Sequence, residues 1–280
     1  MNDKNIRGRL FSEKDSDVFR AIEEIKENPD DENKNLIIRK ITEEKNIFIL
    51  IKLLELIKTW EDCWLIGEIF PILQNSGEEY IRASLVKAVA ECPEKKYDDY
   101  ILRCLDDPDP RVRANAIECV EIRGMKETIP GLVKLLKDTS PRVKINAARA
   151  LFEFGDKRML QVLKKLIETK DHFIAESAIH TLSEIGTTES LNILAEHLHK
   201  NTGDRTLLRL LSVFAEKGDE KIIPAVRKLS LSYNKRISEA AEYTMRKILD
   251  RKDEEQVCRN CGEKSPAGQK FCGSCGKKLF

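Results

Sequence analysis

The chain has 280 residues, of which 41% are hydrophobic and 35% are charged. This composition supplies enough apolar side chains for a buried core and excludes a chain that is disordered throughout. The 49 Lys and Arg residues nearly balance the 48 Asp and Glu residues, and the net charge is +1. The chain therefore lacks the overall basic excess that is typical of sequence-independent nucleic-acid binding.

The N-terminal residues and the most apolar stretch predict neither export nor membrane insertion. The first ten residues lack the apolar core of a signal peptide. The most apolar stretch, 47–57, contains Lys52 and Glu55 and is too short to cross a bilayer. We therefore expect a cytoplasmic protein without a membrane partner, in which cysteine thiols stay reduced.

The N-terminal part of the chain predicts helices that precede a repeat. Apolar residues recur at helical spacing over 13–43, and we assign residues 1–45 to an N-terminal helical cap. Trp60 and Trp64 follow, and a continuous helix would place them one turn apart. Such a pair could form an aromatic contact patch, but we expect these side chains to seal the core of the first repeat.

Residues 46–249 repeat a pattern with a period of about 31 residues. Gly124, Gly155 and Gly186 are each 31 residues apart. They end the segments PRVRANAIECVEIRG, PRVKINAARALFEFG and HFIAESAIHTLSEIG, and a weaker copy ends at Gly218 after a slip of one residue. Apolar residues recur at helical spacing in these segments and between them, which predicts two helices per period. Stacked helix pairs bury a continuous core, so we predict an all-α solenoid.

Several positions of the pattern resemble HEAT repeats, in particular the short HEAT-like class of phycobilisome lyases and of many bacterial and archaeal adaptors. They are an early proline in the first helix, an aspartate in the turn within the repeat, and a Val-Arg or Val-Lys pair that opens the second helix: Pro130, Pro224, Asp107, Asp138, Val112-Arg113 and Val143-Lys144. The resemblance implies that second helices line a concave face. It also implies that Arg82, Arg113 and Lys144 are structural residues of an Asp–Arg ladder, which lapses at Ala175.

The outward side of the second helices is expected to be polar, with mixed to acidic charge. Three columns on a helical wheel are Ser84, Asn115, Asn146 and Ser177; Lys87, Glu118, Arg149 and His180; and Glu91, Ile122, Glu153 and Glu184. A fourth column, Tyr80, Arg111, Arg142 and Phe173, combines aromatic rings with guanidinium groups. No column forms the line of Lys and Arg that follows phosphates, so a protein partner is favoured. For the fourth column, a solvated rim stays an alternative.

The sequence does not match the site residues of the HEAT-like enzyme families. Deoxyhypusine hydroxylases bind two iron ions through repeated His-Glu dipeptides, and none of the four histidines, His172, His180, His197 and His199, precedes a glutamate. HEAT-like alkylpurine DNA glycosylases need a basic groove, and phycobilin lyases offer no motif that can be matched here. We therefore predict a non-enzymatic chain without catalytic residues, in which His197 falls on an apolar column and packs in the core.

The last 23 residues hold four of the eight cysteines, as two Cys-x2-Cys pairs with ten residues between them. This spacing makes Cys258, Cys261, Cys272 and Cys275 candidate ligands of one tetrahedral Zn²⁺ ion. A glycine that can adopt positive φ follows each pair, as zinc knuckles require: Gly262 and Gly276. The segment resembles the short zinc ribbons of many bacterial and archaeal proteins, which implies a structural site. An iron site of the rubredoxin kind uses similar ligands and stays an alternative.

The expected organisation is a cap at 1–45, a repeat array at 46–249, a charged linker at 250–257 and a zinc ribbon at 258–280. We expect a scaffold that binds a protein partner on its concave face. The ribbon would move on its linker and add a second contact, and hence avidity. The alternative is a nucleic-acid-associated protein that contacts RNA or DNA through the ribbon. A phycobilin-lyase-like or chaperone-like factor is a third candidate.

Overall fold

The computed structural model describes residues 3–198, 203–250, 255–266, 269 and 271–279. His199 and residues 251–254 of the predicted linker lie outside the described residues. The chain folds into two compact units, Met1–Phe154 and Gly155–Phe280, and each is described by itself. The predicted domain boundaries at 45, 249 and 257 stay predictions.

Most of the described residues belong to helices, as the repeat pattern predicts. The helices are α1 (Asp3–Leu10), α2 (Asp15–Ile25), α3 (Asp31–Glu43), α4 (Ile47–Trp60), α5 (Cys63–Leu73), α6 (Glu79–Ala88), α7 (Asp98–Cys104), α8 (Pro110–Ile122), α9 (Ile129–Leu135), α10 (Pro141–Glu153), α11 (Met159–Ile167), α12 (His172–Ile185), α13 (Thr188–His197), α14 (Asp204–Lys217), α15 (Ile223–Leu229) and α16 (Lys235–Asp250), with short 3-10 turns η1 (Lys95–Tyr97), η2 (Lys126–Thr128) and η3 (Glu220–Ile222). In the described part of the chain, no helix has both the length and the apolar character that a membrane span requires.

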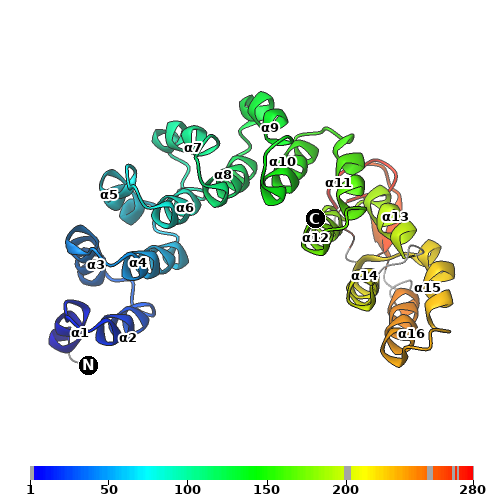
Figure 1. Cartoon of the computed structure of the whole chain (residues 1–280), viewed down its shortest axis with the longest axis horizontal. Helices are drawn as coiled ribbons and strands as arrows, with labels where there is room; N and C mark the ends of the chain where they lie inside the picture. The colour runs from blue at the N-terminus through cyan, green and yellow to red at the C-terminus, as the bar shows by residue number, and fades with distance from the viewer. Residues whose placement is uncertain (1–2, 199–202, 251–254, 267–268, 270, 280) are drawn as a thin grey trace. The chain divides into compact units, whose positions relative to one another are not determined.

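The first unit is a stack of helix pairs. Figure 1 shows α2, α4, α6, α8 and α10 side by side along the inner side of this unit, with α3, α5, α7 and α9 on its outer side. The inner helices pack in sequence, α4 on α6, α6 on α8 and α8 on α10. This arrangement confirms the predicted α-solenoid of helix pairs within the unit.

Helix α8 illustrates how the sequence produces each inner helix. The carboxylate of Asp109 caps the N-terminus by accepting a hydrogen bond from the backbone N–H of Arg111, and Pro110 occupies the first helical position. The apolar column through Ala116 is fully buried. The helix ends before Gly124, whose φ of 64° lies in the left-handed region that glycine adopts at low cost. The inner helices α6, α8 and α10 begin at residues 79, 110 and 141, which confirms the 31-residue period.

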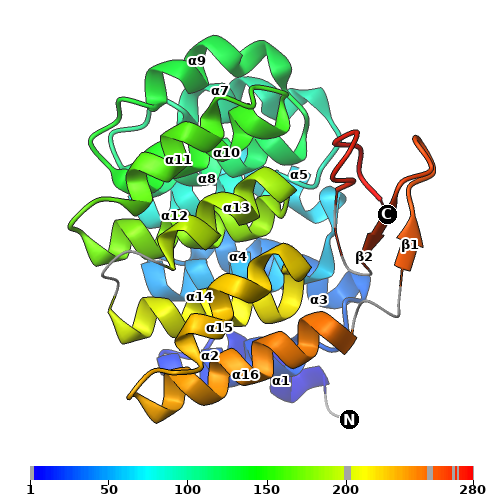
Figure 2. The same cartoon turned by 90° about the vertical axis from the view of Figure 1, so that its right-hand side faces the viewer.

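The second unit continues the pattern and ends in a small two-stranded sheet. Figure 2 shows α13, α14, α15 and α16 stacked within this unit. Helix α14 packs on α12 and on α16, and α15 packs on α16. Helix α14 begins 32 residues after α12, at residues 204 and 172, which confirms the predicted slip of one residue.

Two largely buried ion pairs link successive repeats of the first unit. Arg82 donates two hydrogen bonds to the Asp107 carboxylate, at 2.7 and 3.0 Å. Arg113 donates two to the Asp138 carboxylate, both at 2.8 Å, and two more to backbone carbonyls of the preceding turn. These bidentate pairs confirm the structural role predicted for Arg82 and Arg113. For Lys144, the predicted ladder role stays a prediction.

Two asparagines that were expected to face outward are buried between inner helices. Asn115 donates a hydrogen bond to the Ala83 carbonyl of α6 at 2.9 Å, and Asn146 donates one to the Ala114 carbonyl of α8 at 3.2 Å. The helical wheel was wrong at these positions because it treats one helix alone. In the stack, the edge of each apolar stripe lies against the preceding inner helix.

Replacing Asn115 with alanine is expected to lower the free energy of unfolding by about 1–3 kcal/mol, because the Ala83 carbonyl loses its buried partner. Urea denaturation measures this change. The matched control is Ser177→Ala at an exposed position of the same column, which should change stability by less than about 0.5 kcal/mol. Equal losses in the two variants would show that the asparagine bond is not the cause.

The two tryptophans do not share a helix. Trp60 ends α4, Glu61 adopts a left-handed φ of 51°, and Trp64 is the second residue of α5. The Trp60 indole N–H donates to the Lys26 carbonyl at 2.9 Å, so it ties α4 to the end of α2. The side chain of Trp64 is 54% exposed. Trp60 is half-buried, so for this residue the core-sealing role stays a prediction, and for Trp64 it is wrong.

Candidate metal centre and helix surface

The C-terminal cysteines are presented by two turns of the same geometry. Strands β1 (Glu255–Val257) and β2 (Lys264–Pro266) pair antiparallel, and the first turn connects them. In that turn, the Cys258 N–H donates to the Glu263 carbonyl and the Gly262 N–H donates to the Cys258 carbonyl. The turn that carries Cys272 and Cys275 repeats both bonds, with Lys277 and Gly276 as partners. Both turns are therefore zinc knuckles in form, as predicted.

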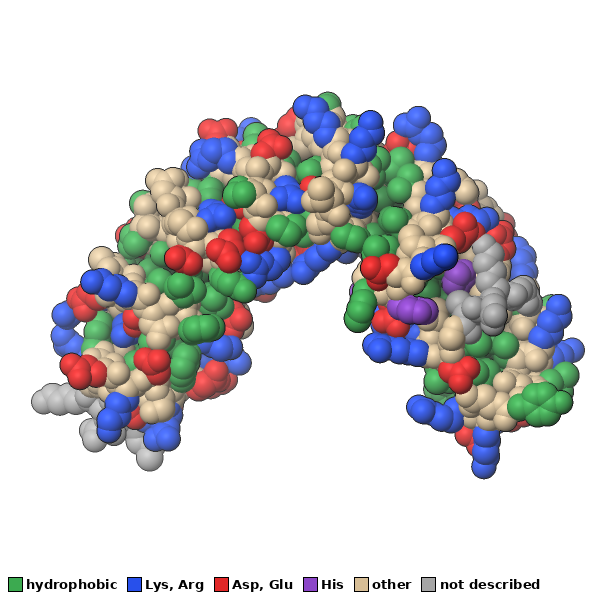
Figure 3. Space-filling model, viewed as in Figure 1, with side chains coloured by type: hydrophobic (Ala, Val, Ile, Leu, Met, Phe, Trp, Pro, Cys, Tyr) green, Lys and Arg blue, Asp and Glu red, His purple; other side chains and the backbone are tan. Residues whose placement is uncertain are grey.

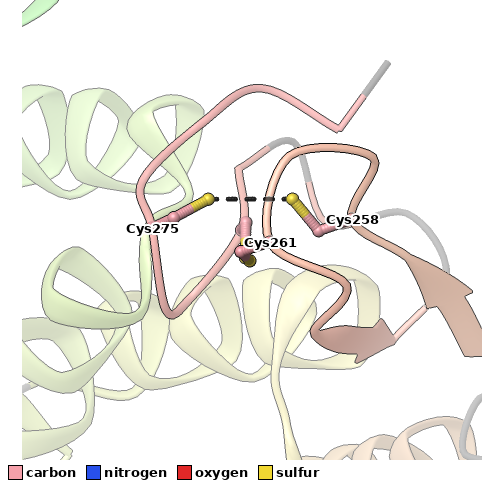
Figure 4. Close-up of side chains that lie close together, drawn as sticks. Cys258, Cys261 and Cys275 are labelled. Atoms are coloured by element: carbon pink, nitrogen blue, oxygen red, sulfur yellow. Dashed lines mark hydrogen bonds between the residues drawn. The ribbon is translucent and has the colours of Figure 1, made fainter.

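The four predicted ligands converge on one point. All four sulfur atoms lie within 4.8 Å of one another. The Cys258 and Cys275 sulfurs are 3.7 Å apart and point toward each other, as Figure 4 shows, and the Cys261 and Cys272 sulfurs are 3.5 Å apart. Sulfurs bound at about 2.3 Å to a tetrahedral ion are about 3.8 Å apart. The cluster is therefore compatible with Zn²⁺, and its size fits one ion.

The electrostatics of the cluster also favour a cation. The backbone N–H of Lys277 stabilises the Cys275 thiolate and lowers the pKa of that thiol to about 6. At Cys261 the backbone N–H of Glu263 acts in the same direction, but the neighbouring sulfurs outweigh it and raise the pKa to about 12. One thiol of the cluster thus ionises easily and another resists, because the hydrogen bonds among the sulfurs favour the thiolate at Cys275 and the thiol at Cys261. A divalent cation removes this conflict.

The ribbon lies against helices of its own unit. A Cβ atom at Gly273 would be 2.9 Å from the Thr188 hydroxyl oxygen, and one at Gly276 would be 3.9 Å from the Lys157 ammonium. The second knuckle therefore lies against the first residue of α13. The predicted mobility of the ribbon stays a prediction. The close approach at Gly273 depends on the absence of a side chain.

A row of exposed aromatic and arginine side chains follows the first turns of the inner helices in unit 1. Phe48, Tyr80, Arg111 and Arg142 are the second residues of α4, α6, α8 and α10; we call them the aromatic–arginine row. Because these helices pack in sequence, the four positions are neighbours. The Arg111 guanidinium stacks 3.9 Å above the Tyr80 ring. Phe173, which was expected to extend the row, is 81% exposed in the second unit.

The charges beside the row are mostly paired. Arg111 contacts Asp109 and Glu79, and Arg142 contacts Glu118 at 3.5 Å. Further along the same helices, Arg149 contacts Glu121 at 3.0 Å. Figure 3 shows acidic and basic side chains interspersed with hydrophobic ones over the visible face of this unit. The surface therefore has mixed charge, as the outward columns predict.

The remaining cysteines show a feature that the sequence interpretation missed. Cys63, at the start of α5, and Cys92, in the turn after α6, form a disulfide with a Cα–Cα distance of 5.4 Å. The expectation that all scattered thiols stay reduced is therefore not met by this pair. Cys104 and Cys119 are free and buried, and burial raises the pKa of their thiols to about 11 and about 12. These two are inert core residues.

The histidines form no site in the part of the chain that the structure describes. His197 is 8% exposed, which confirms its predicted packing role, and His172 and His180 are exposed on α12. Within the described ranges, the clusters with ligand geometry are the four ribbon cysteines and a group of Cys63, Cys92 and Glu94.

A comparison with known protein families supports the assignment of repeated helix pairs. Two overlapping segments, 67–143 and 129–212, match the family model for HEAT repeats and together cover more than half of the chain. The chain is a HEAT-repeat protein. The matched repeats extend from α5 to α14. A comparison with curated protein sequences finds no match.

Solved HEAT-like structures share this fold at low sequence identity. The X-ray structure of YibA from Escherichia coli is 19% identical, with a TM-score of 0.55 over 89% of this chain and 93% of that one. The CpcE–CpcF complex of phycocyanin lyase from Nostoc sp. is 14% identical, with a TM-score of 0.56 over 89% and 94%. Human deoxyhypusine hydroxylase reaches a TM-score of 0.40 at 13% identity over 88% and 96%. For YibA and the CpcE–CpcF complex, identities this low show a shared fold alone.

The prediction of a non-enzymatic chain is corrected by this comparison. The HEAT-repeat fold of this chain is shared with phycocyanin lyase, an enzyme, over most of its length. The repeat architecture therefore gives no ground for excluding catalysis. The prediction was wrong because it relied on the histidine and groove patterns of particular families, and those patterns test only those families.

Proposed function

We propose that this HEAT-repeat chain is a scaffold that binds a protein partner through the aromatic–arginine row of its first unit. The observation that carries the proposal is the exposure of large aromatic side chains on neighbouring helices. Phe48 is 74% exposed and Tyr80 is 48% exposed, and the Arg111 guanidinium stacks on the Tyr80 ring. Aromatic and arginine residues are enriched at the centres of protein interfaces and supply most of their binding energy.

The charge pattern of the row supports a protein partner over a phosphate backbone. Arg111 and Arg142 both contact carboxylates of their own unit, so their charge is largely balanced. A groove that follows phosphates needs several cations in a line to release counterions. The row instead offers apolar area beside balanced charges.

We further propose that the four ribbon cysteines bind one structural Zn²⁺ ion. The spacing of the sulfurs and the two matching knuckles support this assignment. Four thiolates leave no open coordination position, which is typical of structural sites. Arg259, Lys277 and Lys278 are exposed on the ribbon, so the folded ribbon offers a second, basic contact surface.

Replacing both Phe48 and Tyr80 with serine is expected to abolish capture of the partner, because the two rings are the largest apolar surfaces of the row. The full chain is immobilised, native lysate is treated with nuclease, and bound proteins are identified by mass spectrometry. The matched control is Tyr243→Ser on α16, which removes a tyrosine of similar exposure in the second unit. A partner should survive nuclease and the control, and disappear with the double variant.

Other outcomes of the same experiment would contradict the proposal. Binding that disappears with nuclease, or capture of nucleic acid alone, would favour the ribbon as a nucleic-acid contact. A partner that the double variant retains would place the interface elsewhere. Visible absorbance in the eluate would favour a chromophore-protein factor.

A further inference from the structure

The cysteine pair of the first unit lies beside a third metal-binding side chain. Ligand atoms of Cys63, Cys92 and Glu94 all lie within 4.8 Å of one another. Two sulfurs and a carboxylate oxygen are donors that Zn²⁺ accepts. The three residues come from two segments, the first residue of α5 and the turn between α6 and η1, which the packing of α5 on α6 brings together.

One carboxylate oxygen of Glu94 is an unsatisfied hydrogen-bond acceptor. Its Oε2 atom is buried and has no hydrogen-bond partner among the residues that the structure describes. A buried polar oxygen without a partner destabilises the fold. A cation between this oxygen and the two sulfurs would satisfy it. A disulfide that serves only as a cross-link needs no such neighbour.

Arg123 holds the turn that carries two of the three ligands. Its guanidinium donates to the Cys92 carbonyl, to the Glu94 carbonyl at 3.2 Å and to the Asp98 carboxylate at 2.5 Å. Asp98 balances its charge, so Arg123 fixes the backbone of the turn through the carbonyls. The positions of both ligands are therefore set in advance by the fold.

The pair is accessible to small reagents. Cys92 is fully buried, but Cys63 is half-buried at the N-terminus of α5. A cavity of about 510 Å³ lies beside Cys92, and its lining includes Arg123 and Asp98. The lining of this cavity includes neither Cys63 nor Glu94, so a metal ion, a reductant or a peroxide would approach the pair from the half-buried Cys63.

We propose that the Cys63–Cys92 disulfide is the oxidised, metal-free state of a redox-gated zinc site formed by Cys63, Cys92 and Glu94. A dithiol reductant converts the disulfide to two thiols and is itself oxidised to a disulfide. The two thiols lose two protons as they bind one Zn²⁺ ion, and Glu94 is the third ligand. In reverse, H2O2 takes two electrons from the bound thiolates, the S–S bond forms, two hydroxide ions are produced and Zn²⁺ leaves.

The site differs in kind from the ribbon cluster. Three protein ligands leave one coordination position open, whereas the four ribbon cysteines close theirs. The ion at Cys63, Cys92 and Glu94 should therefore exchange with chelators at concentrations that leave the ribbon ion bound. The scaffold proposal does not depend on this site, because none of its ligands belongs to the aromatic–arginine row.

The test is the zinc content of the full chain in two redox states. Protein reduced with a phosphine and dialysed against Zn²⁺ should hold two zinc ions by elemental analysis. One equivalent of H2O2 should then release one ion and produce the Cys63–Cys92 link, detected by peptide mass spectrometry. A reduced chain with a single zinc ion, or formation of the link without zinc release, would overturn the proposal.

Variants separate this site from the ribbon. Cys63→Ser should hold one zinc ion in either state, and Glu94→Gln should weaken the second ion at least about tenfold. The matched control is Cys104→Ser, which removes a buried free thiol of the same unit and should keep two ions. The Cys258→Ser/Cys261→Ser chain should hold one ion when reduced and none after H2O2. If Cys63→Ser fails to fold, the zinc contents of the reduced and the oxidised wild-type chain test the proposal without it. A second zinc ion in a folded Cys63→Ser chain would refute the site.

Discussion

Replacing Cys272 with serine is expected to remove one zinc ion per chain and to unfold the ribbon while leaving the helices intact. The ribbon has little apolar surface of its own, and its fully buried side chains include Cys258 and Cys272 themselves. Binding of a structural Zn²⁺ contributes about 10–16 kcal/mol in comparable small folds, and this energy is the folding energy of the module. Without the fourth thiolate, most of that energy is lost.

Elemental analysis and limited proteolysis measure this effect. The variant should lose one zinc ion and become susceptible to cleavage after α16, while its far-ultraviolet circular dichroism keeps its helical signal. Ser274→Ala, an exposed change within the same knuckle, is the matched control and should keep both metal and resistance. Iron in place of zinc in the wild-type chain would refute the identity of the metal, and a resistant, folded Cys272→Ser tail would refute its structural role.

Replacing Arg113 with alanine is expected to lower the free energy of unfolding by about 3–5 kcal/mol. The change leaves the Asp138 carboxylate buried without its bidentate partner, and the Asp107 and Pro108 carbonyls lose a donor as well. Only 12% of the Arg113 side chain and 7% of the Asp138 side chain are exposed, so the pair is largely shielded from water. Urea denaturation followed by circular dichroism measures the loss.

The matched control is Arg142→Ala, which removes an arginine of the same unit from a far more exposed pair. Its side chain is 56% exposed and 3.5 Å from Glu118. Pairs of this kind contribute about 0–1 kcal/mol. If both arginine variants lost the same stability, burial of the Arg113–Asp138 pair would not be the source of its strength.

The same pair predicts how stability depends on pH. Burial opposes ionisation of Asp138, but the hydrogen bonds from Arg113 and from the Ser140 backbone outweigh it and hold the pKa of that carboxyl below its ordinary value. Because the folded-state pKa is lowered, the pair stabilises the fold fully above the unfolded-state pKa of about 4. This contribution is lost as the pH falls through the lower, folded-state pKa. The stability difference between wild type and Arg113→Ala should therefore shrink below about pH 4.

The sequence predicted best those features that depend on local spacing. Gly124, Gly155 and Gly186 end helices because positive φ is cheap for glycine, and this rule applies within a single turn. The metal-ligand geometry at Cys258 and Cys261 is likewise set by the short turn that contains both. Such features need no knowledge of distant packing, which is why the period, the helix pairs and the ligand cluster could be predicted.

The features that were missed depend on contacts between helices. Cys63 and Cys92 are 29 residues apart and meet only because α5 packs on α6. Asn115 faces the neighbouring helix, which a wheel drawn for one helix does not include. The break between the two tryptophans did leave a local signal: Asp62 caps α5 by accepting a hydrogen bond from the Leu65 N–H, so a helix start was readable there.

The links between repeats restrict how the length of this chain can change in evolution. Each ladder pair, Arg82–Asp107 and Arg113–Asp138, joins residues 25 apart, and each buried asparagine reaches a carbonyl 32 residues earlier. Duplicating or deleting one whole period leaves every such partner at its proper distance. A gain or loss of a few residues inside an inner helix would break the bonds of that helix to the preceding repeat and to the following repeat. Lineages of this chain should therefore differ in length by whole repeats, with smaller insertions confined to the turns between helices.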